Sequence, residues 1–317
     1  MRKVLTTLAE LVLVLLLVSF GVFLLVALIP GDPAVAILGD GFPPEAYAAL
    51  RAELGLDRPL LVRYGDWLLG VLSGDLGSSI IPPQTDVLDR ILAALPVSLQ
   101  LAGMGLAMAI VLAVPLAMWS ASKPGGVVDR IIGASMFGIL SVPAFLIGLL
   151  LVLVFVNELG WFPRAQWVRI GADPIGNLHH AFLPALVIAL SELALFTRIL
   201  RNDLVTTLNE DFILAARAKG MHPVRILVGD ALRPSSFSVV TLLGISVGRL
   251  VGSTVIVEYL FALPGMGTLV VNAANQGDFP MVQGAVLVVA TIYVLVNAGI
   301  DLSYGYLDPR TRRAHAA

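Results

Sequence analysis

The chain has 317 residues, of which 58% are hydrophobic and 13% are charged, about half the charged share of an average soluble protein. This composition excludes a disordered chain, and it leaves too little polar surface to cover a soluble globule. The net charge of −2 gives no basic field for nucleic acid, and the absence of cysteine excludes disulfides, iron–sulfur clusters and thiolate metal sites. The sequence therefore indicates an integral membrane protein.

Six apolar stretches are long enough to cross a bilayer, which takes about 20 residues of helix. They lack an alternation of period two, which favours helices over a barrel. The first stretch is too long for the apolar part of a signal peptide, so we expect an uncleaved helix. In chain order the six cover 8–29, 96–119, 131–156, 182–200, 237–257 and 281–303. We predict an all-α membrane protein with six transmembrane helices.

The distribution of basic residues predicts that both termini are cytoplasmic. With the N-terminus inside, most of the 20 Lys and Arg residues fall in inside segments, as the positive-inside rule expects. We divide the chain accordingly into four parts. These are an N-terminal transmembrane helix (1–30), an external loop domain with amphipathic helices (31–95), a five-helix core (96–306) that includes a cytoplasmic loop (201–236), and a cytoplasmic tail (307–317).

The external loop is predicted to hold two helices. The first runs over Pro44–Leu54. In the second, Asp57 is a candidate N-cap, Pro59 lies in the first turn, and apolar residues recur at helical spacing until Gly74. This second helix either lies at the membrane surface or packs within a small external cap, and neither alternative implies chemistry.

The cytoplasmic loop contains a strongly specified short helix. Asn209 is a candidate N-cap for a helix over Glu210–Lys219, with acids in the first turn, bases in the last turn and Gly220 after it. This order suits both the helix dipole and a left-handed residue after the C-cap. The small residues Ala215 and Ala216 would let another surface approach the backbone closely, although such pairs also occur in ordinary helices.

Eight short motifs of this chain resemble those of one protein family. Ala215-Ala216-x-x-x-Gly220, between two predicted transmembrane helices, resembles the EAA loop of bacterial ABC importer permeases, with Leu214 where the motif's name places Glu. Ala231-Leu232-Arg233-Pro234 resembles the continuation of that loop in the peptide branch. The other matches are Ile29-Pro30-Gly31-Asp32-Pro33, Leu54-Gly55-Leu56-Asp57-Arg58-Pro59-Leu60, Gly74-Asp75-Leu76-Gly77-Ser78-Ser79, Glu258 to Gly267, Asp278-Phe279-Pro280 and Leu307-Asp308-Pro309-Arg310.

The chain as a whole resembles the dipeptide/oligopeptide/nickel-type ABC permease family, specifically its B-type subunit with a long first external loop. The resemblance implies a type I ABC importer permease fold that spans the bacterial cytoplasmic membrane several times. It implies import of short peptides by alternating access. Nickel chelates, oligosaccharides or other small solutes are alternative cargoes, and a stand-alone secondary transporter is a weaker alternative because no convincing internal repeat is present.

The same resemblance implies partners. They are a homologous second permease subunit, two cytoplasmic ABC ATPases, an external solute-binding protein and membrane lipid, with no nucleic acid. The chain contains no Gly-x-x-x-x-Gly-Lys-Ser/Thr loop. We therefore expect no enzymatic activity and no cofactor in this chain, with ATP and Mg²⁺ held by the partner subunits.

Three groups of residues are candidates for function. Two charges lie near mid-depth in predicted spans, Glu192 and Arg249; we favour an ion pair, and the alternative is contact with the charged ends of a peptide on the solute path. Adjacent His179 and His180 lack further ligands, so we expect no metal site. The ATPase-coupling candidates are Phe212, Ala215, Ala216, Arg217, Lys219, Gly220 and Met221, and the candidates for an outer gate element, or for a simple connecting turn, are Glu258, Pro264, Gly265 and Gly267.

Overall fold

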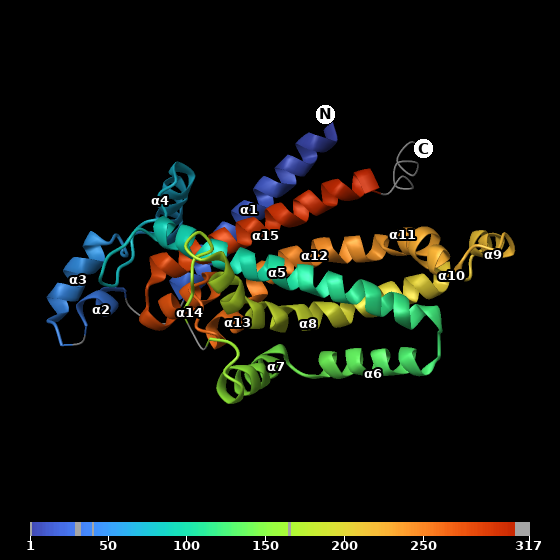
Figure 1. Ribbon diagram of the computed structural model, residues 1–317. Helices are drawn as coiled ribbons and strands as arrows, with labels where there is room; N and C mark the ends of the chain where they lie inside the picture. The colour runs from blue at the N-terminus through green and yellow to red at the C-terminus, as the bar shows by residue number, and fades with distance from the viewer. Residues whose placement is uncertain (1, 29–32, 40, 164–165, 308–317) are drawn as a thin grey trace. The chain divides into compact units, whose positions relative to one another are not determined.

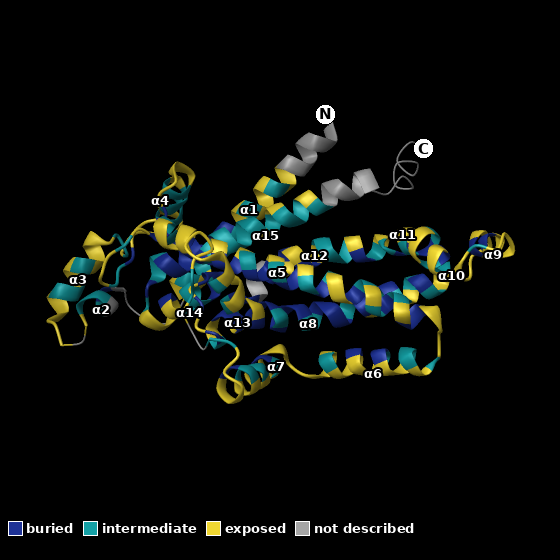
Figure 2. Cartoon of the chain, viewed as in Figure 1, coloured by how far each residue is buried: buried dark blue, intermediate teal, exposed yellow. Residues whose placement is uncertain are grey.

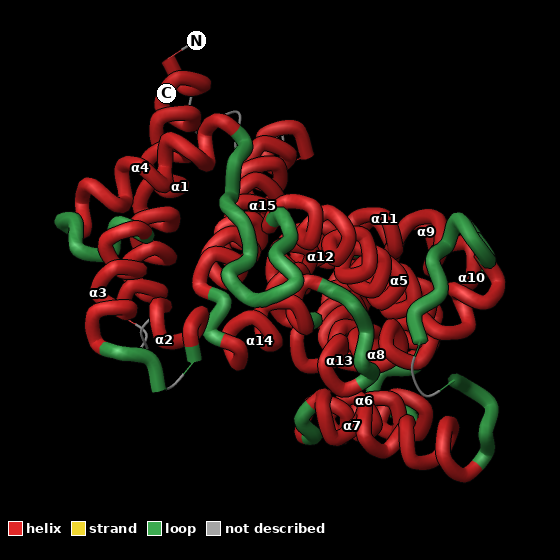
Figure 3. The backbone as a smooth tube through the Cα atoms, turned by 90° about the vertical axis from the view of Figure 1, so that its left-hand side faces the viewer, coloured by secondary structure: helices red, strands yellow, loops and turns green. Residues whose placement is uncertain are grey.

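The structure is a computed structural model that describes residues 2–28, 33–39, 41–163 and 166–307 (Figure 1). In these ranges the regular structure is helical, apart from a single β-bridge between Ser78 and Asp86 (Figure 3). Four helices are long and apolar enough to span a membrane, or up to six if each of two bent pairs is one span. The prediction of an all-helical membrane protein is confirmed. The predicted tail after residue 307, and most of the Ile29–Pro33 motif, lie outside the described residues.

The chain divides into two compact units. The first combines Met1–Ser98 with Pro264–Ala298, and the second combines Leu99–Leu263 with Gly299–Ala317. This division follows packing, so the four-part division above, which follows membrane topology, stays a prediction. The helices of the first unit are α1 (Arg2–Leu28), α2 (Pro33–Leu38), α3 (Pro44–Glu53), α4 (Leu60–Ser73), the start of α5 (Val87–Ser122), α14 (Met266–Gln276) and most of α15 (Phe279–Leu307).

The core of the first unit joins the end of the external loop to three helices. Leu76 packs in one apolar cluster with Val87 and Ile91 of α5, Met266 of α14 and Met281 of α15. The cluster brings together residues that lie more than two hundred positions apart in the sequence. The segment after α4 is therefore fixed to α15 by burial of apolar surface.

A hydrogen bond in the same unit connects two of the sequence motifs. The hydroxyl of Ser79 donates to Oδ2 of Asp278 at 2.5 Å, and the backbone N–H of Ile80 donates to Oδ1 at 3.3 Å. Asp278 is only 4% exposed, so its carboxylate depends on these donors. Met266, at the start of α14, donates its N–H to the Ser98 hydroxyl at 2.8 Å.

Helix α4 packs its aromatic face on α1. Tyr64 meets Phe20 and Phe23 edge-on, with ring centroids 5.1 and 5.5 Å apart, and Trp67 lies 5.7 Å from Phe23. This packing does not distinguish a helix at the membrane surface from one within an external cap, so both alternatives stay predictions. The predicted cap at Asp57 is wrong, because Pro59 occupies the N-cap position, whereas Gly74 ends the helix in a left-handed conformation as its place in the sequence suggests.

The second unit is built around one long helix. Its elements are the rest of α5, α6 (Val127–Ser141), α7 (Ala144–Leu151), η1 (Val152–Glu158), α8 (Pro174–Thr207), α9 (Asp211–Ala218), α10 (Pro223–Arg225), η2 (Ile226–Ala231), α11 (Leu232–Ser235), α12 (Phe237–Ser253) and α13 (Val255–Leu260). Helix α8 packs against α6, α7, α11, α12 and α13 and is the most buried of the long helices (Figure 2). Helix α5 approaches it closely at Gly105, where a Cβ would lie 2.6 Å from Ile188.

The predicted third span is not one continuous helix. Helix α6 ends at Ser141, and α7 starts at Ala144 after a bend of 99°. The cause is Pro143, which forces the preceding Val142 into an extended conformation and cannot donate a backbone hydrogen bond. The proline in the middle of this apolar run indicates the break in the helix, which a hydropathy profile alone does not detect.

Candidate functional site

The short helix predicted in the loop 201–236 is present as α9, at one end of the second unit beside α10 (Figure 1). It runs over Asp211–Ala218, close to the predicted Glu210–Lys219. The predicted N-cap is wrong: Glu210 holds that position, and the Asn209 side chain instead donates to the Val205 carbonyl at 2.9 Å. Asn209 thus belongs to the end of α8, which continues further than hydropathy indicates.

The C-terminus of α9 has the predicted glycine signal. Gly220 is left-handed, with φ of +75°. Its N–H donates to the Arg217 carbonyl at 2.9 Å, and the N–H of Met221 donates to the Ala216 carbonyl at 3.3 Å. These two bonds form a Schellman motif, which satisfies carbonyls that the helix leaves open. A residue with a Cβ at position 220 would strain this turn.

The predicted coupling residues fall on two different faces of α9. Ile213 and Ala216 (9% exposed) are buried toward the chain itself, where α9 packs against η2. Phe212 is 51% exposed, and Ala215 and Lys219, three and seven residues later, are exposed on the neighbouring face. Ala216 therefore belongs to the internal support of the helix, and Ala215 to the surface that it offers. The function of both residues stays a prediction.

Helix α9 is attached to the long helices at both ends. It follows α8 directly, and through η2 it leads into α11. The hydroxyl of Ser235 on α11 is hydrogen-bonded to the Thr207 hydroxyl on α8, with the oxygens 2.9 Å apart, and to the Ala231 carbonyl at 2.8 Å. The Arg217 side chain also contacts the end of α8, where it donates to the Leu208 carbonyl at 3.3 Å. A displacement of α9 would thus move the ends of α8 and α12 together.

The two mid-span charges meet. Arg249 on α12 forms an ion pair with Oε1 of Glu192 on α8, and the Ser246 hydroxyl donates to Oε2 at 2.7 Å. The Glu192 side chain is 2% exposed, whereas that of Arg249 is 56% exposed. An Arg inside a span does not face hydrocarbon, so this face of α12 must meet protein or water in the membrane. Sequence reasoning identified both charges but missed Ser246, which follows from its position three residues before Arg249 on the same helix face.

A second charged network was not identified from sequence. Arg201 of α8 donates from Nε and Nη2 to the two oxygens of Asp129 on α6, at 3.0 and 2.6 Å. The same carboxylate accepts from the Ser120 hydroxyl at 2.5 Å and from the Gly125 N–H at 2.7 Å. The α5–α6 connection is therefore clamped to the end of α8. The signal was weak, because 72 residues separate the two charges.

The predicted outer element is a turn followed by a helix. Helix α13 ends at Leu260, Ala262 has a φ of +51°, and Gly265 caps α14, a helix that the sequence analysis did not predict. The segment crosses the boundary between the two units. Glu258 is fully buried and accepts from the Thr254 hydroxyl at 2.8 Å. Pro264 opens the first unit's second segment and Gly267 is buried in α14; their predicted role as an outer gate is untested.

The two histidines each contact a backbone carbonyl. Nε2 of His179 lies 2.8 Å from the Trp161 carbonyl, and Nδ1 of His180 lies 2.7 Å from the Gly176 carbonyl. Among the described residues, no group of three or more His, Cys, Asp or Glu could hold a metal ion.

Comparison with known proteins establishes the family. The signature of binding-protein-dependent transport system inner membrane components matches residues 113–313, and the signature of the N-terminal part of such components matches residues 1–102. The chain is 36% identical over 310 residues to a putative peptide transport system permease protein of Brucella abortus (strain 2308), covering 98% of both chains. It is 32% identical over 290 residues to the oligopeptide transport system permease protein AppB of Bacillus subtilis, covering 91% of this chain and 92% of that one.

The chain belongs to the family of inner membrane components of binding-protein-dependent transport systems. It is a multi-pass inner membrane protein and a transporter permease, a class that is not itself an enzyme. The resemblance drawn from the short sequence motifs is confirmed.

Unequal burial of the Glu192–Arg249 pair predicts unequal mutant effects. We expect Arg249→Gln to lower stability by about 3–5 kcal/mol, the cost of leaving a buried carboxylate without its cation. Glu192→Gln should cost clearly less, because the guanidinium that remains is half exposed. Thermal unfolding of the detergent-purified permease measures both. The double variant should be more stable than Arg249→Gln alone; equal and additive losses would contradict a coupled pair.

The clamp on Asp129 predicts a local opening. Asp129→Asn should speed hydrogen exchange of the Gly125 amide about ten-fold or more, because hydrogen bonds to charged groups contribute about 1.5–3 kcal/mol. Exchange of a peptide covering residues 120–130, followed by mass spectrometry, measures this. Arg130→Gln, at an exposed neighbouring position, is the matched control and should leave the exchange unchanged. Identical protection in Asp129→Asn would show that the clamp does not hold this connection.

Proposed function

We propose that this chain is the transmembrane permease subunit of an ATP-driven ABC importer that moves short peptides across the bacterial cytoplasmic membrane by alternating access. One observation carries the proposal: α9 is a helix of eight residues with one exposed face, ended by a Schellman motif, and it is attached directly to α8 and, through η2 and α11, to α12. A displacement of such a helix would be passed on to the long helices to which it is attached. The names of the relatives, which are peptide and oligopeptide permeases, support the cargo.

In this proposal the chain has six spans with both termini in the cytoplasm. It pairs with a homologous second permease subunit, and two cytoplasmic ATPases hold ATP and Mg²⁺, since this chain has no phosphate-binding loop. An external binding protein delivers the solute. When the ATPases close on ATP, they displace α9, and the displacement reorients α8 and α12 as rigid bodies.

The exposed side of Arg249 supports a position for the solute path. A cation that is half exposed at mid-span needs a polar neighbour, which either water in the path or the second permease subunit supplies. Glu192 neutralises this charge from within the chain. The path would then run along the face of α12 that carries Arg249, with polar groups available to the charged ends of a peptide.

The two faces of α9 give a test of coupling. We expect Phe212→Asp and Ala215→Asp to reduce ATP-driven uptake by at least ten-fold in proteoliposomes with the complete importer, with unchanged thermal stability, because both side chains are exposed. Ala216→Asp should instead lower the unfolding temperature, because it buries a carboxylate against η2. Ala52→Asp, an exposed alanine on α3, is the matched control. Normal uptake by Phe212→Asp and Ala215→Asp would show that this face of α9 is not the coupling surface.

The cargo has its own experiment. The importer is purified with its binding protein, and the bound ligand is identified by mass spectrometry; we expect peptides. A nickel chelate or an oligosaccharide would replace the cargo and leave the permease assignment intact. In contrast, uphill accumulation by this chain alone in liposomes, without any ATPase, would overturn the ATP-driven importer itself.

A further inference from the structure

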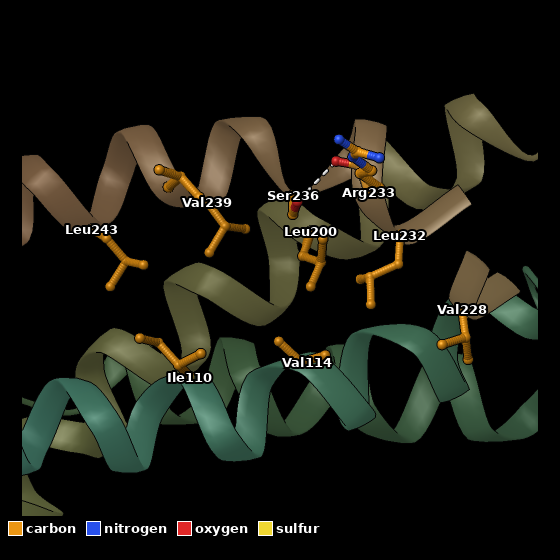
Figure 4. Close-up of a pocket in the computed structure, with 10 residues that line it drawn as sticks. Ile110, Val114, Leu200, Val228, Leu232, Arg233, Ser236, Val239 and Leu243 are labelled. Carbon is orange, nitrogen blue, oxygen red and sulfur yellow. Dashed lines mark hydrogen bonds between the residues drawn. The ribbon is translucent and has the colours of Figure 1, made fainter. Parts of the chain in front are cut away.

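A cavity of about 300 Å³ lies in the second unit, where α5 and α8 meet η2, α11 and α12 (Figure 4). Ile110 and Val114 of α5 point toward Val239 and Leu243 of α12, with Leu200 of α8 between them. The remaining lining residues are Val228, Leu232, Arg233, Ser236 and Val240. Apart from Arg233 and Ser236, the side chains of this lining are aliphatic.

Water is a poor occupant of this cavity. A buried water needs two to four polar partners. The Ser236 hydroxyl already donates to the Arg233 carbonyl at 2.9 Å (Figure 4), and the floor formed by Ile110 and Val114 offers no polar group. Hydrocarbon suits the cavity better, because lipid tails are as apolar as its aliphatic lining.

Arg233 marks one end of the cavity. It is exposed, and in Figure 4 its guanidinium lies on the side away from α5. Within the described part of the chain, no acidic side chain forms an ion pair with it. It is also the only charged residue of the lining. The site thus has an apolar body and a free cation at its rim, which is the chemistry of an anionic amphiphile.

The position of the cavity specifies the source of that amphiphile. The lining includes the first turns of α12 and the loop residues before it, the segment that also carries Arg217, Lys219 and Arg225. Basic pockets between helices on the cytoplasmic side recruit anionic phospholipids, whose surface potential is negative there. That this end is cytoplasmic rests on the proposed function.

We propose that this cavity binds an anionic phospholipid of the inner leaflet, with one acyl chain between α5 and α12 and the headgroup phosphate at Arg233. The lipid would fill the space beside η2, the segment that supports α9. It would therefore stabilise the packing through which the coupling helix acts on α12.

The test uses the complete importer, reconstituted with equal amounts of phosphatidylglycerol and phosphatidylcholine and studied by native mass spectrometry. We expect phosphatidylglycerol to be retained in preference. Arg233→Gln should weaken its retention about five-fold, the effect of one cation near an anionic surface. Val114→Trp, which fills the cavity, should abolish the preferential retention.

Two matched controls separate the site from the general lipid belt. Arg130→Gln removes an exposed charge on α6 that does not line the cavity, and Val111→Trp places the same ring on an exposed position of α5. Both should retain lipid as the wild type does. Equal retention of the two lipids by the wild type, or unchanged retention in Val114→Trp and Arg233→Gln, would overturn the proposal. Loss of the second permease subunit from Val114→Trp would also overturn it, by assigning the cavity to the subunit interface.

Uptake measured on the same preparations keeps the two proposals distinct. ATP-driven uptake without preferential lipid retention would contradict the lipid site and leave the proposed importer function intact. If the assembly retains the lipid preferentially but hydrolyses no ATP and imports nothing, the importer function is contradicted and the lipid site is supported.

Discussion

A carboxylate inside a membrane span must find its hydrogen-bond donors within the protein, since lipid supplies none. Glu192 meets this requirement with Ser246 and Arg249, both on α12. The pairing fixes α12 against α8 at one depth and in one rotation, because the two oxygens are occupied by residues three apart. Apolar packing alone is less specific in a bilayer, where hydrocarbon competes equally for aliphatic surface.

Helix α8 carries two further polar ties at other depths. Near its start, Gln100 of α5 donates to the Asn177 side chain, whose amide donates to the Val168 carbonyl at 2.7 Å. Near its end, Arg201 holds Asp129. The three ties point to three different neighbours, α5, α12 and α6. They make α8 the frame of the second unit, and α9 extends directly from that frame.

The segments next to this frame are interrupted rather than continuous. Helices α6 and α7 are bent at Pro143, and η2, which supports α9, is a π-helix. π-helical turns are rare and concentrate at functional sites, because their weaker hydrogen-bond geometry tolerates rearrangement. In the proposed mechanism, such breaks would let a small movement at α9 become a change of tilt, since the strain would be taken up at defined positions.

The positions of the apolar helices, the short helix α9 with Gly220 after it, and the charges Glu192 and Arg249 could be predicted from the sequence. They are predictable because hydropathy, helix-end residues and charge within an apolar run are local signals. The sequence did not indicate the cap at Glu210, where Asn209 was the better candidate by residue type but was already used by the end of α8. The ion pair between Asp129 and Arg201 could not be predicted either, because only the fold brings these two distant residues together.

The split of α9 into two faces has the same origin. Ala215 and Ala216 are identical in a composition argument, and only the packing of η2 decides that one is covered and the other exposed. In the proposed mechanism, this difference matters for how a displacement of α9 would reach α12. Part of it would pass through Ile213 and Ala216, the buried residues on the side of α9 that packs against η2. The proposed coupling would therefore depend on the buried face of α9 as well as on its exposed face, and a cavity left empty beside η2 would make that connection more compliant.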